Sequence, residues 1–139
     1  MQFNKKIGNR IVTMSKANKG DFNAYRRQII TYLVPSKEKI NVLNDESHFY
    51  LKIQDMDLRL IGIVQIAEID ETTAEIKVSI PNEPWELRYG TEVIHQLVKN
   101  FTMKKTYSRI YLKKSKTVDR YKKERPEMFK NGNYCIEIA

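Results

Sequence analysis

The feature that most constrains the fold is a pair of apolar segments separated by a short polar turn. Residues 74–80 alternate strictly between apolar and polar side chains, which is the period of a strand with one buried face. The preceding run, residues 58–69, is long, β-branched and apolar on both faces. With residues 70–73 as the turn, the two runs predict an antiparallel hairpin whose first strand is central in a sheet.

Strand and helix patterns alternate along the rest of the chain. Asp21 is an expected helix N-cap, and Pro35 ends that helix, whereas Gly90 and Thr91 open a second helix with a single apolar stripe. Pro126 breaks or restarts a third helix over residues 117–124. Further strands are expected over 9–14, 49–53, 109–112 and 134–138. This order predicts an α+β (mixed α/β) fold, a mixed and mostly antiparallel sheet flanked by helices.

Composition narrows the class of protein. A chain of 139 residues fits one domain, 1–139, in which residues 1–8 are either flexible or an edge strand. The single cysteine, Cys135, excludes an intrachain disulfide and favours a reducing cytoplasm. The start of the chain lacks the apolar run of a signal peptide, and the longest apolar stretch is too short for a membrane helix. We therefore expect a cytoplasmic protein without a membrane partner.

The excess positive charge is concentrated late in the chain. Between residues 104 and 130 there are 11 basic and three acidic residues, which accounts for the whole net charge of +8. Such a segment attracts polyanions, either nucleic acid, an acidic membrane surface or a phosphorylated cofactor, or it is a solvated helix face. Because lysine outnumbers arginine and aromatic side chains are few, we expect no specific nucleic-acid readout.

Segment 80–92, IPNEPWELRYGTE, together with the order of elements around it, resembles the GNAT acetyltransferase superfamily. In that family the loop [Gln/Arg]-x-x-Gly-x-[Gly/Ala] opens a helix, and its free N–H groups hold the pyrophosphate of acetyl-coenzyme A. Here Gly90 matches the last glycine, while Trp85 and Arg88 replace the Gln/Arg and the first glycine. Arg88 either supplies charge to the phosphates or blocks the loop. The cofactor contacts that the resemblance implies are Val78, Ser79, Ile80, Arg88, Tyr89, Gly90 and Thr91.

The resemblance also implies acid–base chemistry on an amine substrate. Glu75 and Glu68 are the candidates for the base, and Tyr121 is the candidate acid because Met128 stands where the family has a tyrosine. No metal-ligand spacing is present, so no metal is expected. The predicted activity is acetyl transfer from acetyl-CoA to a primary amine of unknown identity. The alternatives are a catalytically degenerate GNAT-fold protein with a binding or regulatory role and a basic nucleic-acid-binding module.

Overall fold

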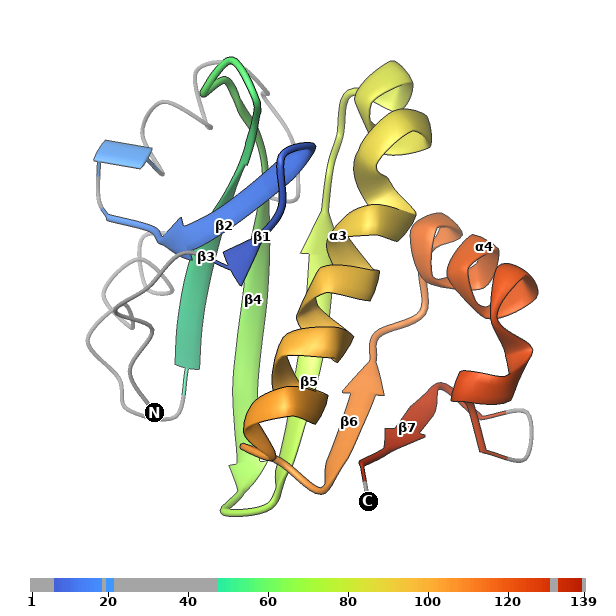
Figure 1. Cartoon of the computed structure of the whole chain (residues 1–139). Helices are drawn as coiled ribbons and strands as arrows, with labels where there is room; N and C mark the ends of the chain where they lie inside the picture. Colours follow the sequence, from blue (N-terminus) through green and yellow to red (C-terminus); the bar gives the residue numbers. More distant parts are fainter. Residues whose placement is uncertain (1–6, 19, 22–47, 131–132, 139) are drawn as a thin grey trace.

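A computed structural model describes residues 7–18, 20–21, 48–130 and 133–138. They form one seven-stranded sheet in which each strand lies beside its neighbours in the sequence, in the order β1-β2-β3-β4-β5-β6-β7 (Figure 1). Neighbouring strands are antiparallel except for β5 and β6, which are parallel. The predicted mixed, mostly antiparallel sheet with helices is therefore confirmed. The expected first helix, between Asp21 and Pro35, lies outside the described residues.

The described strands and helices follow the predicted order, except that the strand expected over 9–14 begins only at Val12, after a separate short strand at Ile7–Gly8. Their bounds are β1 Ile7–Gly8, β2 Val12–Lys16, β3 His48–Asp55, β4 Leu60–Asp70, β5 Thr73–Ser79, α3 Glu83–Lys104, β6 Arg109–Leu112, α4 Lys116–Glu124, the 3-10 helix η2 Pro126–Met128 and β7 Cys135–Glu137. The predicted hairpin is β4 and β5, paired in antiparallel register. Within the ambiguous first eight residues, β1 is an edge strand, and residues 1–6 are not described. No helix in the described part of the chain has the length and apolar character to span a membrane.

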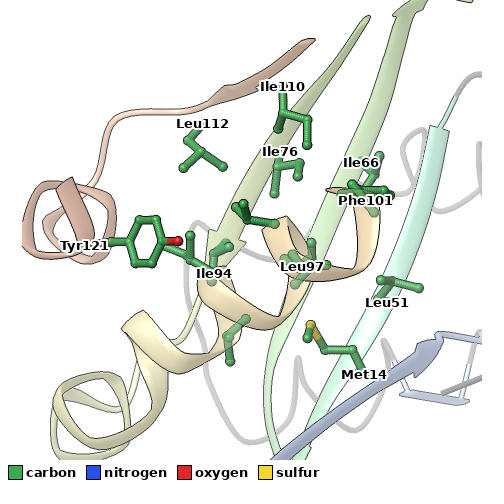
Figure 2. Close-up of a cluster of buried hydrophobic side chains, with 14 of the residues drawn as sticks. Met14, Leu51, Ile66, Ile76, Ile94, Leu97, Phe101, Ile110, Leu112 and Tyr121 are labelled. Atoms are coloured by element: carbon green, nitrogen blue, oxygen red, sulfur yellow. The ribbon is translucent and has the colours of Figure 1, made fainter. Parts of the chain in front are cut away.

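The core lies between α3 and one face of the sheet. The apolar stripe of α3 is buried, and it meets side chains from β2 to β6 (Figure 2). Tyr121 of α4 reaches the same core from the side of β6 and is fully buried (Figure 2). Cys135 of β7 is buried and makes no disulfide, as expected for a small core residue. Burial of this stripe, at roughly 25 cal/mol per Å² of apolar surface, is what holds α3 on the sheet.

Candidate functional site

The parallel strands β5 and β6 separate before β5 ends. Their pairing stops at Ile76 and Leu112, whereas β5 continues to Ser79. The last hydrogen bond across the junction runs from the Lys113 N–H to the Ile76 carbonyl oxygen, at 2.8 Å. Backbone groups alternate sides along a strand, so the N–H and C=O of Val78 point the same way as those of Ile76. Among the described residues no strand continues beside Val78, which leaves an open backbone edge.

Segment 113–117 forms one wall of this opening. It is tied to β5 through the Lys113 N–H and to α3 through the Thr117 hydroxyl, which donates to Glu86 Oε1 at 2.8 Å. Between these two points the Ser115 side chain caps α4 by accepting from the Val118 N–H at 3.2 Å. The opening is therefore bounded by the end of β5, the start of α3 and segment 113–117.

Helices α3 and α4 approach each other closely at Gly90. A Cβ atom at this position would lie 2.6 Å from Thr117 Cγ2, so only glycine fits the observed helix spacing. One turn earlier, Arg120 Nη1 donates to both carboxylate oxygens of Glu86, at 2.8 and 3.1 Å, and Arg120 Nη2 donates to the Glu86 carbonyl oxygen at 3.1 Å. Gly90 thus has a packing role that the sequence pattern did not indicate.

The prediction that a loop precedes Gly90 is wrong, because α3 begins at Glu83. Asn82 is the N-cap, and its Oδ1 accepts from the Trp85 N–H at 3.1 Å. Pro84 suits the first helical turn because it has no N–H to leave unpaired. Asn82 and Pro84 therefore set the start of the helix, and Gly90 lies inside it. Residues 85–90 are therefore helical, and their backbone N–H groups are used within the helix or its cap.

The predicted cofactor residues lie at the end of β5 and in the first turns of α3, and they do not form a loop. Arg88 is exposed on α3, and its guanidinium carbon lies 5.1 Å from the centre of the Tyr89 ring. Since no loop is present, the idea that Arg88 blocks one is also wrong. Tyr89 is buried and Thr91 is half-buried. Ser79 and Ile80 are buried at the end of β5. Contacts of these residues and of Val78 and Gly90 with a cofactor stay predictions.

Glu75 lies on the sheet face opposite α3. Its neighbours Ala74 and Ile76 are fully buried on the α3 side, so the alternation of β5 directs Glu75 to the other face, where it is exposed. Its register partner on β6 is Tyr111, which is 37% exposed. The pair stands one residue before the strands separate. Glu75 is therefore the predicted carboxylate nearest the opening along β5.

Glu68 occupies the distant end of the hairpin. Its register partner is Ala74, four residues from Val78, which corresponds to about 13 Å along a strand. The Tyr107 hydroxyl donates to Glu68 Oε1 at 2.8 Å. Burial and this carboxylate both raise the pKa of Tyr107 far above its ordinary value. The structure thus does not bring Glu68 together with the opening.

Tyr121 has the environment of a core aromatic. Its hydroxyl oxygen lies 3.2 Å from His95 Nδ1, and its ring meets Phe129 edge-on at 6.0 Å between centres. Burial raises the pKa of Tyr121 to about 12. Its ring is directed into the core beside Ile94 (Figure 2), so Tyr121 and Glu75 do not share one site.

Two groups at the opening were absent from the predicted site. One is Tyr111, beside Glu75, and the other is the run of exposed lysines on segment 113–117. The signal that identifies them is the strand–helix–strand order of β5, α3 and β6. Such a crossover places two strands parallel and adjacent, and therefore places the end of β6 beside the middle of β5.

Comparison with known proteins identifies the architecture. No family model and no curated protein matches the chain. Among solved structures, a spermidine N-acetyltransferase chimera from Vibrio cholerae and hSSAT has a TM-score of 0.66 at 18% identity, over 91% of this chain and 95% of that one. The chain has the GNAT acetyltransferase fold.

Two further structures share the fold. Spermidine N-acetyltransferase from Vibrio cholerae in complex with CoA and spermine has a TM-score of 0.59 at 19% identity, over 75% of this chain and 71% of that one. A protein from Sphaerobacter thermophilus, whose name assigns it to the acetyltransferases, has a TM-score of 0.68 at 14% identity, over 91% of this chain and 82% of that one. At such identities the likeness establishes the GNAT fold, and the activity is argued below from the site.

Proposed function

We propose that this protein transfers an acetyl group from acetyl-coenzyme A to a primary amine. The observation that carries the proposal is the open backbone edge of β5 at Val78. A pantetheine arm contains amide groups, which pair with a free strand edge as an added strand does. The fold shared with a spermidine N-acetyltransferase reported with CoA and spermine supports this reaction class.

The strand edge fits the arm of this co-substrate better than the start of α3 fits its pyrophosphate. In the first turn of α3, Pro84 has no N–H, and the N–H groups of Trp85 and Glu86 are taken by Asn82. Only the Glu83 N–H remains, and Glu83 itself is acidic. The strand edge at Val78 is the better match. When bound, acetyl-coenzyme A supplies an acyl group activated as a thioester.

Glu75 is the proposed base. Its carboxylate is exposed near the point where β5 and β6 separate, and it takes one proton from the substrate ammonium. The free amine then attacks the thioester carbonyl carbon, the C–S bond breaks, and the sulfur keeps the electron pair. A second proton from the amine nitrogen ends on the sulfur. The positions of Glu68 and Tyr121 support a structural role for both, and we do not assign them a step.

The first experiment tests the strand edge with matched variants. Val78→Pro removes the N–H that points into the opening, whereas Val78→Ala reduces the side chain and retains that N–H. We expect both variants to fold, because this N–H faces away from β4. Isothermal titration with acetyl-coenzyme A should give at least about tenfold weaker binding for Val78→Pro than for Val78→Ala. A tenfold difference corresponds to the loss of about one hydrogen bond between neutral groups. Equal affinities would contradict the proposed binding mode.

The second experiment tests the reaction. The protein is incubated with acetyl-coenzyme A and a panel of primary amines that includes spermidine, and free thiol and acetylated amine are measured together. We expect both products to appear in equal amounts and Glu75→Gln to slow their formation most strongly at low pH, where less of the amine is deprotonated. Absence of both products across the panel would contradict the proposed reaction.

A GNAT-fold protein without catalysis is the second candidate. The observation in its favour is the start of α3, where phosphates would approach and where the one N–H left in the first turn belongs to the acidic residue Glu83. This candidate predicts no binding of acetyl-coenzyme A by the unaltered protein at millimolar concentration. The titration described above therefore separates the two functions before any activity is measured.

A further inference from the structure

We propose that the phosphates of coenzyme A are held by Lys113, Lys114 and Lys116 rather than by the start of α3. This inference rests on the proposed function, because it concerns the same ligand. It assigns phosphate binding to side chains that follow β6, on the opposite wall of the opening from the predicted loop. The ligand class is a phosphorylated thiol, and the recognised groups are its phosphates.

The position of the three lysines follows from the contacts of their segment. The backbone of Lys113 is bonded to Ile76, two residues before the open edge at Val78. Three residues after Lys114, the side chain of Thr117 touches the first two turns of α3. The segment between these anchors therefore runs along the opening, and all three lysines on it are exposed.

The local charge is positive because, between residues 113 and 120, the three lysines outnumber the one carboxylate, that of Asp119, which keeps its charge. Glu86 is bonded to Arg120, with a salt bridge of 2.8 Å. The Asp119 carboxylate accepts from the Tyr134 hydroxyl at 2.6 Å. In the described part of the chain, none of the three lysines forms an ion pair with a carboxylate. Lys114 Nζ lies 6.0 Å from the centre of the Tyr134 ring, a contact that leaves its charge in place. An incoming phosphate thus meets an excess of ammonium groups, which act as point charges with adaptable geometry.

The start of α3 offers no competing site. Its one remaining N–H in the first turn belongs to Glu83, whose carboxylate repels phosphate. Gly90 is the single match to the family's loop, and Thr117 packs against it and fills the space where a ligand would lie. The phosphates of a ligand whose arm follows the edge of β5 therefore have the more favourable approach on the lysine side, where three lysines stand against the single exposed Arg88 on α3.

The test compares ligands that differ in phosphate content. Coenzyme A, dephospho-coenzyme A and pantetheine are titrated into the intact protein and into the triple variant Lys113→Gln, Lys114→Gln, Lys116→Gln. The matched control is Lys99→Gln, Lys104→Gln, Lys123→Gln, which removes the same charge from exposed lysines elsewhere on α3 and α4. Circular dichroism confirms that each variant is folded.

The inference predicts that the intact protein binds coenzyme A at least about tenfold more tightly than pantetheine. The triple variant at the opening should lose most of that preference and bind pantetheine as before, while the control stays within about twofold of the intact protein. The preference should also decrease with added salt. Equal coenzyme A affinity in the two triple variants would overturn the inference and leave the proposed function standing. Failure of the intact protein to bind either ligand would overturn both.

Discussion

Replacing Gly90 with alanine adds one methyl group at the narrowest contact between α3 and α4. The new Cβ would lie 2.6 Å from Thr117 Cγ2 and 3.3 Å from Arg120 Nη2. Neither side chain is free to turn, because the Thr117 hydroxyl and the Arg120 guanidinium are both bonded to Glu86. The helices must therefore move apart or the hydroxyl bond must break.

The size of the effect follows from two opposing terms. Alanine in a helix interior is more stable than glycine by about 1 kcal/mol. Overpacking a fixed contact costs about 1–3 kcal/mol. We therefore expect Gly90→Ala to reduce the free energy of unfolding by up to about 2 kcal/mol. In a Thr117→Ser background, which removes Cγ2 and keeps the hydroxyl, the same change should be stabilising by about 1 kcal/mol.

Urea unfolding of the unaltered protein, both single variants and the double variant measures this reversal of sign. The reasoning is refuted if Gly90→Ala stabilises the protein equally in both backgrounds, because the close approach would then carry no cost. Titration with coenzyme A adds a second reading. If Gly90 serves packing only, the double variant and Thr117→Ser should bind coenzyme A with equal affinity. If the backbone at Gly90 contacts the phosphates, the double variant should bind coenzyme A more weakly.

Three further predictions concern the side chains of Glu86, Asp55 and Arg88. Glu86→Gln leaves Arg120 without its charged partner, so the unfolding free energy should fall by about 1–3 kcal/mol in urea titrations. Burial acts to raise the pKa of Asp55, but hydrogen bonds from Arg59 outweigh it and lower that pKa. This contribution to stability is present above about pH 4 and is lost as the pH falls further, so acid unfolding should be less steep in Asp55→Asn. Arg88→Ala should leave coenzyme A affinity within about twofold in isothermal titration, because the phosphates are assigned to the lysines of segment 113–117 and the Arg88 guanidinium lies over the Tyr89 ring; a larger loss would make Arg88 a phosphate ligand.

The sheet was predictable because its patterns are local. Strict alternation over residues 74–80 identifies β5, and the polar turn before it identifies the hairpin. The strand over 109–112 and the helix over 117–124 were expected within one residue of their bounds. In each case side chains two or four residues apart share a face, so the sequence alone carries the information.

The start of α3 was missed because its glycine is explained by a tertiary contact. A glycine in a helix interior costs about 1 kcal/mol relative to alanine, so Gly90 was interpreted as the opening of the helix. The cost is offset by the close approach of Thr117, which is 27 residues away in the sequence. The signals for the true start, Asn82 as cap and Pro84 in the first turn, were present in the sequence.

The sequential strand order has a consequence for hydrogen exchange. Strands β1 to β5 form one antiparallel ladder, and β6 with β7 and α4 form a second part that pairs with it through four residue pairs of β5 and β6 and packs on it through the contacts of α4 with α3. Separation of these two parts requires breaking far fewer bonds than unravelling the ladder, so amide protons of β6 and β7 should exchange at a lower opening free energy than those of β4. A ligand lying between Val78 and the lysines of segment 113–117 touches both parts, and so it should slow exchange in β6 and β7 far more than in β4.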